Sequence, residues 1–556
     1  MRKLIITLFA MIPLLGLAQA TKTVTVTAPG ELANQISNDE KFKIAELTVS
    51  GPLNGNDIKL LQQMVNRAKA NDKKGECLVT KLDLSGAIIQ EGKDGMKLKA
   101  NELPDDCFSD AKGLVSVVLP QTLVAVCKDC FDNCTALTEV TIPASVTRIE
   151  NGAFEDCYAL AAIALPDGLT NIGEEAFKNC KALTGINIPS QLNKISKATF
   201  KGCVALSSVS LPESIKAIEA DAFSGCKSIE AFRLPEGVTE IGNGAFEDCE
   251  SLTSIDLDKV QKIANNAFEG CTRLNAVSCG NLSSLGSDAF KDCASLASAD
   301  LSGSLTSIGS EAFCGCKQLA AVNFPSSLKE IGSNAFKGCQ ALQAIDLPET
   351  LEKINGHAFE GCISLRQVIV PKMVKAIGNS AFEGCSQLDS VAVNGLVTEI
   401  TAGTFKDCTS LRAISLPNTV TNIGNKAFQG CVAMPSISLP VALKFIGDDA
   451  FEKCSSLTSI EIPLSVASIG SDAFFECVML QSAVLPAALK KIGGSAFAKC
   501  PSLREVRLNS PAPPSISKST FKDVVNCIFW IPRRSGSIYM ADKIWSKISG
   551  IKEMEY

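Results

Sequence analysis

The chain has 556 residues and a formal net charge of −6. Its charges form no basic stripe, which argues against a nucleic-acid partner. His357 is the single histidine, which argues against histidine-based catalysis and against histidine-rich metal sites. We therefore expect no enzyme and no cofactor.

Residues 1–20 have the pattern of a secretory signal peptide. Two basic residues follow the initiator methionine, and Leu4 to Leu17 is apolar but too short to span a bilayer. Ala18 to Ala20 forms a small-x-small cleavage site, and the next residue is Thr21 rather than a cysteine that could take a lipid anchor. No later segment reaches the ~20 apolar residues of a membrane helix. The sequence predicts an exported protein, at the cell surface or outside the cell, without a transmembrane span.

Residues 21–100 are expected to cover the N-terminal end of a repeat domain, because an open end of such a domain would expose its core. Ile44 to Val49 is a predicted strand. Asn56 or Asp57 can cap a helix with one apolar face. That face would carry Leu60, Leu61, Met64 and Val65. Lys81 to Ile89 already resembles a repeat but lacks its phenylalanine.

Residues 101–506 are internally repetitive, and the repeat predicts a solenoid. A phenylalanine followed three residues later by cysteine occurs 17 times, in steps of 23 residues apart from two steps of 22. The two short steps, Phe246 to Phe268 and Phe268 to Phe290, lack the proline that most other copies carry after the strand. A residue lost in that turn leaves the core positions in place.

One copy shows how each position contributes. Val140 and Ile142 alternate with polar residues like a short strand with one buried face, and Pro143 ends that strand. Ala153-Phe154 is predicted to form a short helical or 3-10 turn, and Cys157 closes the coil. Stacked coils would pair their strands in parallel at ~4.8 Å and align their phenylalanines and cysteines into a buried spine. Representative spine residues are Phe154, Phe177, Phe200, Phe223, Cys157, Cys180, Cys203 and Cys226.

Repeats such as Leu457 to Cys477 resemble the BspA-like leucine-rich repeats of bacterial surface proteins, including Bacteroides-type members. The resemblance covers residues 108–524. It implies an α/β solenoid of right-handed leucine-rich coils, with short parallel strands and capped ends. It also implies a role in adhesion.

Residues 507–556 are expected to form the C-terminal cap. Three prolines between Pro511 and Pro514 break the repeat, Ile528 to Pro532 is a predicted strand, and Ile538 to Trp545 is a possible short helix. Both tryptophans of the chain, Trp530 and Trp545, lie here, where large side chains can plug the last coil.

The chain has 24 cysteines, of which 17 occupy the repeat position. Equivalent side chains on neighbouring coils point the same way rather than at each other. We therefore expect buried free thiols that behave as small apolar side chains. Cys127, Cys130 and Cys134 are the best candidates for a disulfide or a metal cluster, and the sequence does not decide between these states and free thiols.

The strand face opposite the core is the natural binding surface of a solenoid. Alternation places Asp256, Ser278, Asp300, Asn323 and Asp346 in one outward column over five coils. Carboxylates two coils apart would be ~9.6 Å from each other, too far to share one calcium ion but suited to a cationic partner. Asp256, Asp300 and Asp346 are the predicted binding residues, with an ordinary hydrated strand face as the alternative.

Function follows only broadly from these patterns. A secreted or surface-displayed scaffold for protein–protein interaction, used in adhesion to host or neighbouring-cell proteins, fits the repeat and its family resemblance. The alternative is capture of a glycan or nutrient. Sugar-binding surfaces use exposed Trp or Tyr rings, and this repeat carries few of them.

Overall fold

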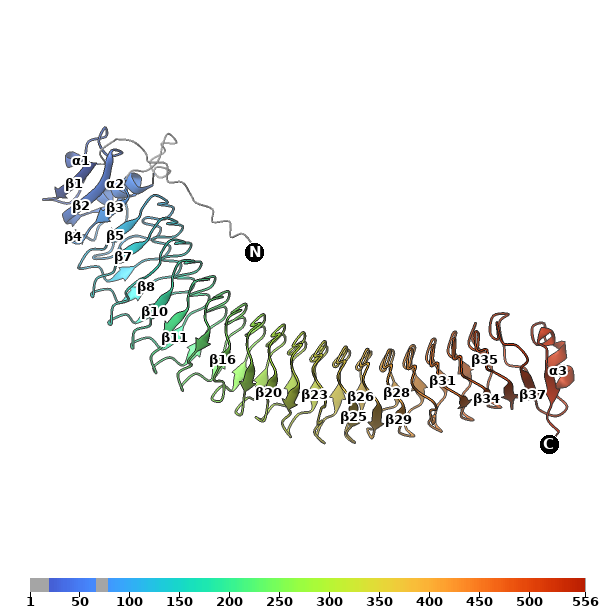
Figure 1. Cartoon of the computed structure of the whole chain (residues 1–556). Coiled ribbons are helices and arrows are strands. Elements are labelled where there is room, and N and C mark those ends of the chain that lie inside the picture. Colours follow the sequence, from blue (N-terminus) through green and yellow to red (C-terminus); the bar gives the residue numbers. More distant parts are fainter. Residues whose placement is uncertain (1–19, 67–78, 556) are drawn as a thin grey trace, which may run out of the picture. The chain divides into compact units, whose positions relative to one another are not determined.

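The computed structural model describes residues 20–66 and 79–555; the predicted signal peptide therefore lies outside the described residues except for Ala20. The chain divides into two compact units, Met1–Leu183 and Thr184–Tyr556. Within each unit the chain winds in successive coils whose short strands pair in parallel with those of the next coil (Figure 1). The predicted solenoid of coils of about 23 residues is thus confirmed.

The N-terminal residues of the first unit extend its strand stack. The elements are β1 (Ala20–Thr25), α1 (Leu32–Gln35), β2 (Ile44–Leu53), α2 (Gly55–Val65), β3 (Lys81–Asp83) and β4 (Ala87–Ile89). The sheet order is β1-β2-β3-β5-β7, with β4 paired to β2. The coils of this unit add β5 (Ser116–Val118), β6 (Ala125–Val126), β7 (Glu139–Thr141), β8 (Arg148–Ile149) and β9 (Asn171–Ile172).

Helix α2 begins two or three residues earlier than the sequence suggested. Its N-cap is Asn54, not Asn56 or Asp57: the Asn54 side chain accepts hydrogen bonds from the N–H groups of Asn56 (3.0 Å) and Asp57 (3.4 Å). The Asp57 carboxylate in turn accepts the Asn54 N–H at 2.9 Å. This reciprocal capping box satisfies donors that a helix start leaves unpaired.

In the second unit, one series of strands follows the leucine of each coil and alternates between core and solvent. These first strands are β10 (Gly185–Asn187), β12 (Ser208–Ser210), β14 (Ala231–Phe232), β16 (Ser254–Ile255), β18 (Ala276–Ser278), β20 (Ser298–Asp300), β22 (Ala321–Asn323), β25 (Gln367–Val370), β27 (Ser390–Val393), β29 (Ala413–Ser415), β32 (Ser459–Glu461), β34 (Ser482–Leu485) and β36 (Glu505–Leu508).

A second strand of two residues precedes the phenylalanine, and the sequence did not predict it. In the second unit these strands are β11 (Lys194–Ile195), β13 (Ala217–Ile218), β15 (Glu240–Ile241), β17 (Lys262–Ile263), β19 (Ser284–Leu285), β21 (Ser307–Ile308), β23 (Glu330–Ile331), β24 (Lys353–Ile354), β26 (Ala376–Ile377), β28 (Glu399–Ile400), β30 (Asn422–Ile423), β31 (Phe445–Ile446), β33 (Ser468–Ile469) and β35 (Lys491–Ile492). Pairing of Ile241 with Ile263 and of Ile263 with Leu285 continues through both short steps. The deletions are therefore absorbed between the two strands of a coil.

The phenylalanine and cysteine lie on a turn with an alternating hydrogen-bond pattern, where the sequence suggested a short helical turn. The N–H groups of Gly152 and Phe154 donate to the next coil, at Glu174 and Ala176 (both 2.9 Å), whereas Glu155 N–H bonds back to Gly152 at 3.0 Å. Residues two before and two after the phenylalanine have left-handed backbone, as at Asp288 and Asp292 (both φ 56). No continuous helix forms because every second N–H bonds to a neighbouring coil.

The rings of these phenylalanines form a stack inside each unit. In the first unit the Phe131–Phe154 and Phe154–Phe177 ring centroids are 5.4 and 5.5 Å apart, with planes within 5° of parallel. In the second unit the spacing ranges from 5.0 Å at Phe474–Phe497 to 5.7 Å at Phe382–Phe405. The rings of Phe154, Phe177, Phe200 and Phe223 are fully buried.

The C-terminal residues add β37 (Ile528–Ile531), α3 (Gly536–Ala541), the 3-10 helix η2 (Trp545–Lys547) and β38 (Ile551–Glu553). The predicted helix at 538–545 is thus two separate elements. Trp545 is buried, with its ring centroid 6.0 Å from that of Phe521, and its indole N–H donates to the Pro514 carbonyl at 2.8 Å. Trp530 is half-buried on β37. Among residues 20–66 and 79–555, no helix has the length and hydrophobicity required to cross a membrane.

Candidate functional site

The outward residues of the first strands form columns across neighbouring coils. The strand register places Ser278, Asp300 and Asn323 in one row. Asp256 directly follows β16, and Asp346 lies two residues beyond the isolated bridge at Ala344. Asp256 and Asp346 are exposed, and Asp300 is half-buried.

The carboxylates of Asp256 and Asp300 accept hydrogen bonds from backbone N–H groups of the turns that follow them. Asp256 accepts the N–H of Asp258 at 3.0 Å, and Asp300 accepts the N–H of Ser302 at 3.1 Å. Both coils lack the proline, which would have removed that N–H. The aspartate thus satisfies the donor that the missing proline leaves behind, as in an Asx turn.

Asp300 is engaged a second time, because Asn323 Nδ2 donates to its Oδ1 at 2.9 Å. Asp346 precedes Pro348 and has no such turn donor. The three aspartates therefore differ in environment, and their predicted role in binding a cationic partner remains a prediction. No group of three or more His, Cys, Asp or Glu that could hold a metal occurs in the described part of the chain.

Exposed apolar side chains gather at the turn after the first strand in the second unit. Val441 and Leu464 directly follow a proline on neighbouring coils and are 72% and 78% exposed. They line a shallow hollow together with Ile437, Glu461 and Val484. We call Val441 and Leu464 the apolar rim.

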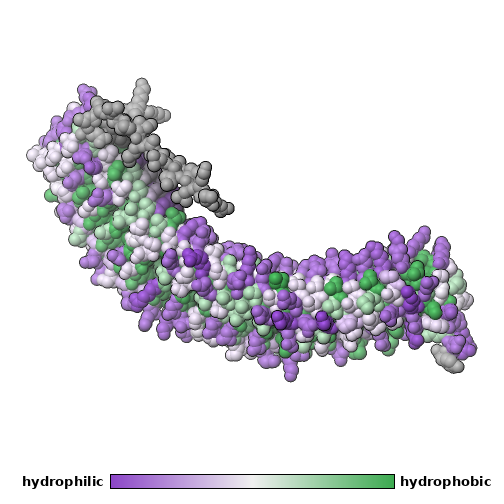
Figure 2. Space-filling view, viewed as in Figure 1, coloured by the Kyte–Doolittle hydropathy of each residue, from purple (hydrophilic) through white to green (hydrophobic). Residues whose placement is uncertain are grey.

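A second apolar group lies on coils nearer the N-terminal end of this unit. Ile369 on β25 is 52% exposed, and Met373 and Leu396, in the turns that follow β25 and β27, are 48% and 59% exposed. Elsewhere on the viewed face of this unit, apolar and polar side chains are intermixed, and the apolar ones occur in small groups (Figure 2). Contiguous exposed apolar groups mark interaction surfaces more reliably than single exposed residues do.

Sequence reasoning missed the apolar rim although a signal was present. In other copies the residue after the proline is commonly polar or charged, for example Glu213, Glu236 and Glu349. A comparison of equivalent positions across copies would have singled out Val441 and Leu464. The strand alternation drew attention to the column of aspartates instead.

The repeat cysteines are buried free thiols with a hydrogen-bonding role. Each donates to the carbonyl of the phenylalanine one coil earlier: Cys157 to Phe131 at 3.2 Å in the first unit, and Cys226 to Phe200 at 3.2 Å in the second. Cys180 likewise donates to Phe154 at 3.3 Å, and Cys203 is fully buried. Burial raises the pKa of Cys385 in this position to about 12, so its thiol stays protonated and unreactive.

Cys127, Cys130 and Cys134 are also free thiols in the structure. Cys134 occupies the repeat position and donates to the Phe108 carbonyl at 3.2 Å. Burial raises the pKa of Cys127 to about 12. The three cysteines therefore form no disulfide with one another.

His357 occupies the left-handed position two residues before Phe359 (φ 58). Its Nδ1 is 2.7 Å from a carboxylate oxygen of Glu360. Equivalent positions hold Asn334 and Ser380, also with positive φ. The histidine thus sits at a turn position defined by backbone conformation.

Stacked coils, parallel strands and a buried leucine and phenylalanine in each coil define a leucine-rich repeat solenoid. The family model described as a BspA type leucine rich repeat region matches residues 101–212, 193–320, 283–412 and 398–528. The chain belongs to the BspA-type leucine-rich repeat family.

Several solved structures are similar to this chain. A leucine-rich repeat protein from Bacteroides ovatus is 27% identical, over 79% of this chain and 92% of that one, with a TM-score of 0.47. A leucine rich cell surface protein from Faecalibacterium prausnitzii is 25% identical, over 61% and 88%, with a TM-score of 0.38. A leucine rich repeat protein from Treponema pallidum is 30% identical, over 37% and 78%, with a TM-score of 0.26. A search of curated proteins gave no match.

Proposed function

We propose that this protein is exported and acts at the cell surface or outside the cell as a non-enzymatic scaffold that binds other proteins, in adhesion to host or neighbouring-cell proteins. Membership of a family of leucine-rich repeat scaffolds supports the binding role, and the sequence pattern of residues 1–20 supports export. The similarity to a cell surface protein is consistent with this location.

The observation that carries the binding proposal is the apolar rim. Val441 and Leu464 are more than two-thirds exposed on neighbouring coils and share one hollow. Exposing such side chains to water is unfavourable by ~25 cal/mol per Å² of apolar surface. A protein partner that covers the apolar rim would recover that free energy, with Glu461 at its edge available for a polar contact.

The test compares two double variants on a panel of purified extracellular-matrix and cell-surface proteins, beside a glycan array. Val441→Ser with Leu464→Ser should weaken binding to a panel protein by at least about tenfold, as loss of a central apolar contact does. Val478→Ser with Met479→Ser is the matched control, because these side chains are 40% and 49% exposed at a different turn of the coil. The control should bind like the parent chain.

The results that would contradict the proposal are specific. Equal loss in both double variants would show that the apolar rim is not the contact surface. Binding to glycans with no binding to any panel protein would favour the capture role instead. Export is tested separately, since the mature protein recovered outside the cell should begin at Thr21.

A further inference from the structure

In the second unit, the backbone N–H groups at a repeat phenylalanine and two residues to either side of it donate to the next coil. Asp472 N–H donates to Gly494 at 2.8 Å, Phe474 N–H to Ala496 at 2.7 Å, and Glu476 N–H to Ala498 at 3.1 Å. Each coil therefore needs the next one to accept its N–H groups. The last coil, which contains Phe521, has no repeat after it.

The final coil leaves backbone donors without acceptors. Ser519 N–H is satisfied by the Ser517 hydroxyl at 3.2 Å. The N–H groups of Phe521 and Asp523, which correspond to the donors of Phe474 and Glu476, have no acceptor within the described part of the chain. Asp523 has left-handed backbone (φ 64), like the equivalent Glu476 (φ 59).

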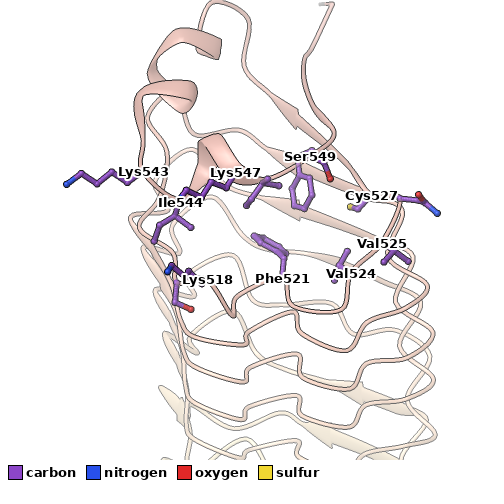
Figure 3. A pocket seen from close by; sticks show the side chains of 13 residues that line it. Lys518, Phe521, Val524, Val525, Cys527, Lys543, Ile544, Lys547 and Ser549 are labelled. Carbon is purple, nitrogen blue, oxygen red and sulfur yellow. The ribbon is translucent and has the colours of Figure 1, made fainter.

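A pocket of about 500 Å³ lies at this place, between the last coil and η2 with its flanking residues. In Figure 3, Phe521 lies between Lys518 and Ile544 at one end of the pocket and Val524, Val525 and Cys527 at the other. Trp545 contacts the Phe521 ring but does not supply an acceptor to its N–H. The pocket thus combines an apolar floor with an unpaired donor.

The charge of the surroundings is positive although the whole chain is negative. Residues 507–556 contain eight Lys and Arg against four Asp and Glu. Lys518, Lys543 and Lys547 line the pocket, and no carboxylate does. None of these three lysines forms an ion pair with a residue that the structure describes. Together with the unpaired N–H of Phe521, they favour a negatively charged ligand.

We propose that this pocket binds a carboxylate attached to an apolar body. The N–H of Phe521, which lines the pocket, donates to the carboxylate in a charge-assisted hydrogen bond. Lys518 and Lys547 add long-range attraction, and Phe521, Phe529 and Ile544 pack against the apolar body. The ligand can be a free amphiphilic acid or the C-terminus of a peptide with a large apolar last residue, since both present the same group.

Trp545 makes the test direct, because its ring packs near Phe521 and Phe529 of the pocket lining, and Trp530 is the only other tryptophan of the chain. The full mature chain carrying Trp530→Phe is titrated with octanoate and with N-acetyl-phenylalanine, and the fluorescence of Trp545 is followed. Octanol and N-acetyl-phenylalaninamide are the neutral partners of these probes. We expect a saturable change with the acids only. A larger response to octanoate identifies a free acid, and a larger response to N-acetyl-phenylalanine a peptide terminus.

Substitution of two lysines tests the electrostatic part. Lys518→Gln with Lys547→Gln should weaken binding of the preferred acid by at least about tenfold, as loss of charge-assisted contacts does. Lys552→Gln on β38 is the control, because Lys552 does not line the pocket, and it should bind like the parent chain. Thermal unfolding of all variants verifies that they fold.

Equal responses to acids and neutral partners, an unchanged dissociation constant in the double lysine variant, or no saturable change at all would each overturn the proposal. The outcome is independent of the protein-binding role, because Val441 and Leu464 do not line this pocket.

Discussion

The two sides of each coil follow different rules. On the phenylalanine side, ring spacing, thiol hydrogen bonds and left-handed turn positions recur almost unchanged from copy to copy. On the strand side and in the turn after it, equivalent positions range from glutamate to leucine, as at Glu236 and Leu464, which each follow the proline of their coil. The contrast teaches that packing between coils restricts the residues on the phenylalanine side. The residues on the strand side can vary, and a partner could recognise that variation.

The largest effect should come from truncating a central phenylalanine. Phe313→Ala removes a fully buried ring whose centroid is 5.4 Å from that of Phe290 and 5.3 Å from that of Phe336. The cavity and lost burial should reduce the free energy of unfolding by about 3–5 kcal/mol. Chemical denaturation of the second unit measures this. A loss below about 1 kcal/mol would show that the stack is not the main source of stability.

A repeat thiol should matter less but measurably. Cys316→Ala removes the thiol that donates to the Phe290 carbonyl at 3.1 Å, while the Cys293 N–H keeps its own bond to that oxygen at 3.3 Å. One acceptor site is left unfilled in the core, so we expect a loss of about 1–2 kcal/mol. Cys314→Ala is the control, because that thiol is only half-buried. Equal losses in both variants would argue against a special role for the repeat thiol.

Asp132 provides a pH-dependent test in the first unit. Burial, followed by the charges of Glu155 and Asp129, raises the pKa of this carboxyl to about 6 from an ordinary value of 3.8. The folded state therefore holds the proton at a higher pH than the unfolded state. The contribution of Asp132 to stability should fall as pH rises from about 4 to 6, and the full penalty should persist above that range.

Asp132→Asn should accordingly stabilise the first unit at pH 7. Solvent screening of a partly exposed group limits the gain to about 1 kcal/mol. The gain should vanish near pH 4, where the native aspartate is protonated in the folded state. Thermal unfolding measured at both pH values gives the comparison. A gain that is the same at pH 4 and pH 7 would contradict the assignment.

The smallest effect concerns the aspartates of the strand side. Asp300→Ala removes the acceptor for the Ser302 N–H, so we expect a loss of about 0.5–1 kcal/mol. Asp346→Ala is the matched comparison, since Pro348 leaves its turn without that donor, and it should be neutral within about 0.5 kcal/mol. Reduced binding of a cationic partner in both variants, with unequal stability, would instead support the column of aspartates as a contact surface.

Features that repeat with the full coil were predictable from the sequence, and features confined to one or two residues were not. The spacing of Phe154 and Phe177 fixes the coil length and the parallel pairing. The strand Arg148–Ile149 is too short for periodicity to reveal. The thiol hydrogen bonds were also missed, because composition alone cannot separate a cysteine that donates from one that merely fills space.

Some features of the candidate surfaces were likewise predictable from the sequence, and others were not. The turn role of Asp256 and Asp300 coincides with the missing prolines and could have been read from aligned copies. The apolar rim could have been found by the same comparison. The pocket beside Phe521 could not, because it depends on how η2 and the residues around it return over the last coil.

The register of the second unit also bears on how such a chain changes length. A strand pairs with the equivalent strand of the next coil, 23 residues further along the chain, as Ala217–Ile218 pairs with Glu240–Ile241. If a whole copy is duplicated or lost, the coils on either side of the change can therefore pair through the same strand register. The residues at both ends of the chain are not affected. Unequal recombination between the gene segments that encode these copies can thus change the number of coils in whole steps, while the sequences of both ends stay the same.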